Sequence, residues 1–324
     1  MVMGGGTIGA LIGSQVTARL VGVTGVANLL LVPAVLLVVG LGVYFLLERS
    51  CEKQAANAAV TKAGRKATGG NPFAGFTAVF KSKYLFGLFM FGALMALCGT
   101  TVYFQQSEIV KAAYADTPFD MELVQPTALK LAEAEGRAVT AEDRENAMAK
   151  LQQEAADIAS TAFFANVNTA VNILAMLAQF FLASRLMRIV GVGWTLAVLP
   201  MIYVLGLILL SLSPTLAVVA IAAIIGRAAE YGICNPAREV LYTAIEREER
   251  YKAKSFIDTV VRRGGDSASG SIYKSLRSEA GGFEMPHVSW MAIPFAITWA
   301  ILSVWIGKEN RRITAKEKPA GENL

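Results

Sequence analysis

Residues 227–266 read RAAEYGICNPAREVLYTAIEREERYKAKSFIDTVVRRGGD, and they are rich in charge although the segments on either side are largely apolar. Six charged side chains of this stretch fall within segments long enough to cross a bilayer: Arg227, Glu230, Asp258, Arg262, Arg263 and Asp266. A charge at the centre of a bilayer costs about 3 kcal/mol on insertion scales, so such charges usually pair or line a polar path. We therefore expect the functional site here.

The composition indicates an all-α, polytopic membrane protein. Apolar residues make up 54% of the 324 residues and charged residues only 17%, whereas a soluble domain has about a quarter charged. A run of about 20 apolar residues spans the hydrocarbon core as a helix, and an open sheet would leave backbone groups unpaired in lipid. Eight candidate transmembrane helices are present, at 3–22, 27–47, 84–104, 160–184, 192–212, 215–234, 254–276 and 288–306.

The distribution of charge predicts the topology. The loop at 105–157 has eleven acidic and five basic residues, whereas the loop at 48–83 has seven basic residues and the tail at 308–324 has five. Because basic loops stay in the cytoplasm, we expect 48–83 and the C-terminus inside and 105–157 outside. The net charge of +5 therefore reflects membrane orientation and does not indicate a nucleic-acid partner.

Several kinds of site are not supported. The chain has a single histidine, His287, and its three cysteines lie far apart, so neither a metal site nor a disulfide framework is expected. The glycines at 4–9 match a dinucleotide fingerprint, but no strand precedes them and no acid occurs before Glu48. No HExxH or GxSxG motif is present. We expect no metal, no cofactor and no enzymatic activity.

Two loops show helical patterns of their own. Phe73, Phe76 and Phe80 share one helical face just before two lysines, which favours a short interfacial helix at the end of the 48–83 linker. In the outer loop, Thr140 to Asp143 resembles a capping box. A helix is therefore expected from about residue 141, running into the span that begins at 160.

The charged spans predict pairing within each helix. Arg227 and Glu230 lie three residues apart and can pair on one face. Asp258, Arg262 and Asp266 recur every fourth residue as a stripe of opposite charges, while Arg263 points about 100° away. The acids and arginines could neutralise each other and lock the two spans together. Alternatively, some arginines could bind an anionic substrate, and both roles can hold together.

Three segments carry a resemblance to a known family. They are Asn-Pro-Ala-Arg-Glu-Val-Leu-Tyr-Thr at 235–243, Arg-Glu-Glu-Arg-Tyr-Lys-Ala-Lys at 247–254 and Phe-Ile-Asp-Thr-Val-Val-Arg-Arg-Gly-Gly-Asp at 256–266. They resemble the ATP/ADP translocase (NTP/NDP antiporter) family, in particular its bacterial branch related to the major facilitator superfamily. The resemblance implies a twelve-helix transporter with two six-helix halves.

On that template the eight spans correspond to helices five to twelve, and the first four helices would lie outside this chain. The implied domains are 1–47, the last two helices of an N-terminal bundle; 48–83, a cytoplasmic linker; 84–307, a six-helix bundle with the external insertion 105–157; and 308–324, a cytoplasmic tail. The resemblance also implies a bacterial inner-membrane location.

The function expected from this resemblance is secondary active transport of an anionic solute by alternating access, with ATP/ADP exchange as the implied cargo. The candidate binding and gating residues are Arg227, Glu230, Asn235, Arg238, Asp258, Arg262, Arg263 and Asp266. The charges of the embedded arginines and acids cancel, so the surplus of bases that a nucleotide requires would come from the absent helices. A transporter of another organic anion and a truncated, non-transporting scaffold are the alternatives. A membrane-embedded enzyme is the weakest alternative.

Overall fold

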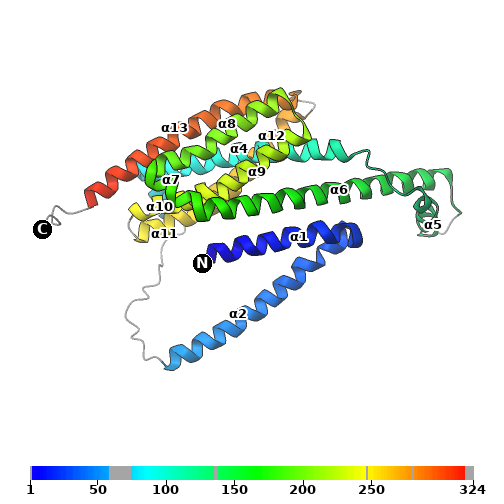
Figure 1. Cartoon of the computed structure of the whole chain (residues 1–324), viewed down its shortest axis with the longest axis horizontal. Coiled ribbons are helices and arrows are strands. Elements are labelled where there is room, and N and C mark those ends of the chain that lie inside the picture. The colour runs from blue at the N-terminus through cyan, green and yellow to red at the C-terminus, as the bar shows by residue number, and fades with distance from the viewer. Residues whose placement is uncertain (1, 58–73, 135–137, 246, 279–280, 318–324) are drawn as a thin grey trace. The chain divides into compact units, whose positions relative to one another are not determined.

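The computed structural model describes residues 2–57, 74–134, 138–245, 247–278 and 281–317. All regular structure within these ranges is helical (Figure 1), which confirms the predicted all-α fold. The helices are α1 (Val2–Leu29), α2 (Leu31–Asn57), α3 (Ala74–Lys81), α4 (Lys83–Tyr114), η1 (Met121–Leu123), α5 (Val124–Ala134), α6 (Ala141–Leu177), η2 (Ala178–Leu182), α7 (Ala183–Ile189), α8 (Val192–Leu212), α9 (Leu216–Ala229), η3 (Glu230–Cys234), α10 (Asn235–Leu241), η4 (Tyr242–Ala244), α11 (Arg247–Phe256), η5 (Ile257–Val261), α12 (Arg262–Arg277) and α13 (Met285–Glu317).

Seven helical segments of the described chain are long and apolar enough to cross a membrane: Ile8–Leu29, Leu31–Arg49, Lys83–Tyr114, Ala141–Ile189, Val192–Leu212, Leu216–Ala244 and Met285–Ala315. They correspond to seven of the eight predicted spans. The remaining predicted span, 254–276, is helical as expected, through the end of α11, η5 and α12. It carries too many charged side chains to be one of these seven apolar segments.

The described helices group into two compact units by their contacts. The first unit comprises Met1–Ile12, Asn71–Ala113 and Asn166–Leu324, and the second comprises Gly13–Gly70 and Tyr114–Ala165. The first unit contains the charged segment, so it is the unit that positions the candidate site.

The second unit contains the predicted helical insertion. Thr140 and Asp143 form the expected capping box: the Asp143 carboxylate accepts from the Thr140 backbone N–H at 2.8 Å, and the Asp143 backbone N–H donates to the Thr140 hydroxyl at 3.3 Å. α6 begins at Ala141 and continues into the predicted fourth span. Helix α5 packs on the first turns of α6 through a small apolar core of Val124, Ala128, Ala147 and Leu151.

The core of the first unit lies where α8 packs closely against α13. A Cβ atom on Gly307 would overlap the backbone of Gly193, so only glycine permits this approach of the two helices. Trp299 of α13 is fully buried, with its ring centroid 5.5 Å from that of Phe91 and 5.6 Å from that of Tyr203. These two uncharged spans therefore bury one face each.

Helix α3 confirms a short helix at the end of the linker. Its Phe76 and Phe80 rings lie 4.6 Å apart and are about half exposed. Phe76 also contacts Phe256 of α11, with ring centroids 5.7 Å apart. Phe73 and most of the basic linker, 58–73, lie outside the described residues. The position of α3 at a membrane interface stays a prediction.

Three π-helical turns interrupt the helices of the first unit, namely η2, η3 and η5. Each π turn closes its hydrogen bonds one residue later than an α turn, and such turns occur frequently at functional sites. η2 and η3 pack against each other at Gly232, where a Cβ atom would lie only 2.7 Å from the Cβ of Ala178. Two candidate residues, Glu230 and Asp258, lie within π turns.

Candidate functional site

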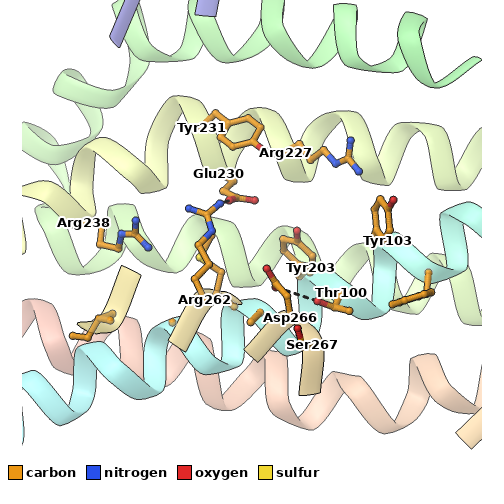
Figure 2. A pocket seen from close by; sticks show the side chains of 16 residues that line it. Thr100, Tyr103, Tyr203, Arg227, Glu230, Tyr231, Arg238, Arg262, Asp266 and Ser267 are labelled. Carbon is orange, nitrogen blue, oxygen red and sulfur yellow. Dashed lines mark hydrogen bonds and ion pairs between the residues drawn. The ribbon is translucent and has the colours of Figure 1, made fainter. Parts of the chain in front are cut away.

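The first unit contains an open cavity of about 450 Å³ between α4, α8, the α9–η3–α10 segment and the η5–α12 segment (Figure 2). We call it the central cavity. Its lining combines aromatic side chains with a group of charges from two neighbouring spans. The lining residues are Gly92, Met95, Ala96, Gly99, Thr100, Tyr103, Phe104, Tyr203, Arg227, Glu230, Tyr231, Arg238, Ile257, Arg262, Asp266 and Ser267.

The structure brings most of the predicted site residues together. Arg227, Glu230, Arg238, Arg262 and Asp266 all line the central cavity. The other three candidates do not. Asp258 contacts Arg238 from outside the cavity, Asn235 is half-buried at the start of α10, and Arg263 is exposed.

The charged residues pair across helices and not along them. Arg262 Nη2 donates to Glu230 Oε1 at 2.8 Å, which joins α12 to η3. Arg238 Nη2 lies 3.3 Å from Asp258 Oδ1, which joins α10 to η5. Each of the two spans thus supplies one acid and one arginine to the crossed pairs. This agrees with the expectation that such charges hold the two spans together.

The predicted pairing within a single helix is therefore wrong. Asp258 and Arg262 were expected to pair at a spacing of four residues, but the π turn η5 contains Asp258 and shifts the helical register before Arg262. Glu230 likewise opens η3 and points to Arg262 instead of Arg227 (Figure 2).

Helix α12 is polar, and contacts with α4 support it along its length. A Cβ atom on Gly265 would lie only 2.9 Å from the Cβ of Ala96, so the two helices approach closely. The Thr100 hydroxyl donates to Asp266 Oδ1 at 3.2 Å. Further along, Arg277 Nη2 donates to Glu108 Oε2 at 2.8 Å. These contacts hold Asp266 and Arg262 at the cavity wall.

Arg227 has a different environment from the other two arginines of the cavity. Among the described residues, no ion pair joins Arg227 to a carboxylate. Its Nη1 donates to the amide oxygen of Asn168 at 3.0 Å, and its Nη2 lies 3.5 Å from the amide oxygen of Gln106. The guanidinium also lies 5.8 Å from the centre of the Tyr103 ring, beside it in Figure 2. The positive charge of Arg227 is thus held by neutral groups.

Asn168 was not among the candidate site residues, and its bond to Arg227 joins α6 to α9. Gln106 and Tyr103 were missed. The third span was expected to end at 104, so Gln106 was assigned to the outer loop, whereas α4 continues to Tyr114 and buries Gln106 completely. The apolar pair Ile109 and Val110, which are also buried, was the signal that the helix continues.

The charge of the cavity differs from the sequence-based sum. The lining includes three arginines, Arg227, Arg238 and Arg262, and two acids, Glu230 and Asp266, which leaves a formal charge of +1. Arg238 lines the cavity, whereas Arg263, which the sequence-based sum had included, does not. Within the described part of the chain, no cluster of histidine, cysteine, aspartate and glutamate could hold a metal ion. The three lining arginines can bind an anion through their guanidinium groups.

Comparison with known families supports the resemblance that the motifs carry. The family model described as TLC ATP/ADP transporter matches residues 148–310, which is half of the chain and includes all the charged residues of the central cavity. Searches of curated proteins and of solved structures found no match. The chain therefore belongs to the TLC ATP/ADP transporter family, and its seven long apolar helices make it a multi-pass membrane protein.

Proposed function

We propose that this protein is a secondary active transporter that moves an anionic solute by alternating access, and that it exchanges ATP for ADP. The observation that carries the proposal is the environment of Arg227, whose guanidinium faces the central cavity without a carboxylate partner among the described residues. A charge in a low-dielectric site is stabilised strongly by a counter-ion. An anion that enters the cavity supplies that counter-ion.

The remaining lining suits a nucleotide. The exposed ring of Tyr103 lies next to Arg227, and Tyr231 also lines the cavity with an exposed ring. Aromatic rings stack with planar groups, so Tyr103 and Tyr231 can hold the base while Arg227 holds the phosphates. The family name points to the same class of cargo.

The formal charge of +1 is small for a nucleotide, which carries roughly three or four negative charges. We propose that further basic residues come from the opposite half of the twelve-helix bundle that the resemblance implies, and that the halves rock around the shared cavity. In this arrangement Arg227 is a primary anion ligand. Arg262 and Arg238 are already paired with acids, so each binds the anion only when its carboxylate partner has left.

The location that we propose is the bacterial inner membrane. The basic 48–83 linker and the C-terminal tail would lie in the cytoplasm, because basic segments are retained on that side. The acidic 105–157 insertion would lie outside. The transport that we propose requires no catalytic reaction by the chain.

Transport by the purified protein in proteoliposomes tests this function. Vesicles loaded with ADP should take up labelled ATP, and unloaded vesicles should not. Replacing Arg227 by Gln removes an ionic hydrogen-bond donor and should lower the rate at subsaturating ATP by about 10- to 100-fold. The matched control is Arg263→Gln, which removes the same charge outside the cavity and should keep the wild-type rate.

Three outcomes would contradict parts of this proposal. Uptake of another organic anion without ATP uptake would eliminate nucleotide exchange but keep transport. Absence of all anion uptake by correctly folded protein would favour a scaffold. Full activity of Arg227→Gln would remove Arg227 as an anion ligand.

A further inference from the structure

A second cavity of about 500 Å³ lies at the end of the first unit where α10 and α11 meet. Its lining residues are Glu239, Tyr242, Thr243, Arg250, Tyr251, Lys254, Ser255 and Asp258. None of these described residues also lines the central cavity. The two cavities meet at one ion pair, because Arg238 lines the central cavity and its partner Asp258 lines the second cavity.

The Arg238–Asp258 pair is loosely bonded. The two atoms lie 3.3 Å apart, whereas the Arg262–Glu230 bond measures 2.8 Å, and hydrogen bonds between charged groups are typically about 2.7–2.9 Å. Among the described residues, Arg238 Nε and Asp258 Oδ1 have no hydrogen-bond partner, although both atoms are buried. The neighbouring Asn235 Oδ1 and Tyr242 hydroxyl are buried without a partner as well.

Unsatisfied buried polar atoms are costly, at about 1–3 kcal/mol each. Two such atoms belong to the Arg238–Asp258 pair itself, and two belong to Asn235 and Tyr242. Within the described protein, the polar atoms between the two cavities therefore have free hydrogen-bonding capacity for other partners.

Both members of the pair have an alternative partner close by. Arg238 lines the central cavity, so an anion inside that cavity can contact it. Asp258 shares the second cavity with Arg250 and Lys254. Lys254 is bonded to Glu239 at 2.6 Å, so Arg250 is the other basic side chain in the lining of this cavity that can receive Asp258. Two discrete sets of ion pairs are the usual basis of a structural switch.

We propose that the Arg238–Asp258 pair is a gate between the two cavities, and that the transported anion opens it by replacing Asp258 on Arg238. This inference rests on the proposed function, because it requires an anion in the central cavity. In the absence of the anion the pair stays closed. The anion favours the open arrangement because it binds Arg238 only when Asp258 has left, which is the differential affinity that a ligand-driven change requires.

The gate explains why transport would be an exchange. A protein that opens the pair only with an anion present cannot return empty, so each outward step must be matched by an inward one. The π turn η5 is the flexible part of this gate, because Asp258 lies within it and Arg262 follows it. A π turn contains one residue more than an α turn. When this extra residue moves along the helix, Asp258 shifts relative to Arg238 and the helix stays intact.

Cysteine accessibility tests the gate without any transport measurement. Cys51, Cys98 and Cys234 are first replaced by serine, and a single cysteine is placed at Ser267 in the central cavity. A membrane-impermeant maleimide is added from the side to which the second cavity opens, predicted to be the cytoplasm. Asp258→Asn should raise the labelling rate of this cysteine about tenfold or more, since it removes an ionic contact that closes the path.

Three variants sharpen this measurement. Glu239→Gln breaks the Lys254 pair inside the second cavity and should leave labelling unchanged. A cysteine at Ser255, which lines the second cavity, should be labelled equally in all backgrounds. The charge exchange Arg238→Asp with Asp258→Arg should restore slow labelling although it cannot bind the anion. If Asp258→Asn does not fold, Arg238→Gln opens the same pair from the other side.

Unchanged labelling in folded Asp258→Asn or Arg238→Gln would overturn the gate, as would equal acceleration by Glu239→Gln. A second readout addresses exchange. Wild-type vesicles loaded with labelled ADP should retain it in nucleotide-free buffer, whereas Asp258→Asn vesicles should release it. If labelling responds as expected but wild-type vesicles exchange no nucleotide, the proposed cargo fails and the gate remains. If nucleotide exchange occurs and labelling does not respond, the gate alone fails.

Discussion

Arg262 Nη2 donates a 2.8 Å hydrogen bond to Glu230 Oε1, and this bond connects α12 to the π turn η3 of the preceding span. The Glu230 side chain is only 12% exposed, whereas that of Arg262 is 41% exposed. The buried acid therefore depends on the arginine for its compensation. This crossed contact therefore links the two charged spans.

Loss of Arg262 should destabilise the fold. Arg262→Gln leaves the buried Glu230 carboxylate without its ionic partner, and such unsatisfied charged groups cost about 1–3 kcal/mol or more. We expect a lower melting temperature in a fluorescence-detected size-exclusion assay in detergent. Arg263→Gln is the matched control, because Arg263 is exposed on the same helix. Equal melting temperatures of the two variants would show that the Arg262–Glu230 bond does not stabilise the bundle.

A carboxylate beside Arg227 should abolish anion binding. Asn168→Asp keeps the size of the side chain but places a negative charge about where its oxygen now accepts from Arg227. It should reduce transport at least about tenfold more than Asn168→Ala, because the new carboxylate pairs with the Arg227 guanidinium that the anion would otherwise bind. The uptake rate at low substrate concentration is the measurement. Asn172→Asp, one turn along the same helix, should have a smaller effect than Asn168→Asp, and the reverse order would contradict the role of Arg227.

The contact between α8 and α13 should not tolerate a side chain at Gly307. Gly307→Ala places a methyl group on the backbone of Gly193 and forces the two helices apart. Overpacking of this kind typically costs about 1–3 kcal/mol. Gly264→Ala is the control, since a Cβ there meets nothing within 4 Å, and alanine is favoured over glycine in a helix by about 0.5–1 kcal/mol. Thermal unfolding should therefore move in opposite directions for the two variants.

The capping box of α6 should stabilise the first turn of the helix without affecting the transport rate. Thr140→Ala removes the side chain that accepts from the Asp143 backbone N–H, a change that costs about 0.5–2 kcal/mol. Hydrogen exchange of the first turn of α6 should become faster, while transport stays unchanged. Ser160→Ala in the same helix removes a hydroxyl that bonds to the Asp157 carbonyl and should leave exchange of that first turn unaltered. Slower transport in Thr140→Ala would instead connect the insertion to the transport cycle.

Much of the fold could be predicted because its signals are local. The length of each apolar run determines a membrane-crossing helix without reference to any other segment. Thr140 caps α6 and Thr215 caps α9 through contacts within a few residues. The charged candidates in the central cavity were also recognisable, since charge within an apolar run is conspicuous in any sequence.

The neutral members of the site were not recognisable in the same way. Gln106 stood beyond the expected end of its span, and Tyr103 had the appearance of any aromatic residue near a membrane surface. They matter because they lie close to Arg227 in space, although Arg227 follows them by more than a hundred residues in the chain. The spacing of residues along the sequence does not show which side chains of different helices lie close together.

The sequence by itself determined the helices, the family motifs and the set of charged residues from which the site is built. Only the tertiary structure decided which acid meets which arginine. Pairs at a spacing of three or four along one helix contribute only about 0.2–0.5 kcal/mol, so they yield readily to a buried partner on a neighbouring helix. The π turns η3 and η5 shifted the register locally, Glu230 and Asp258 were directed to Arg262 and Arg238, and Arg227 retained a charge that no described carboxylate balances.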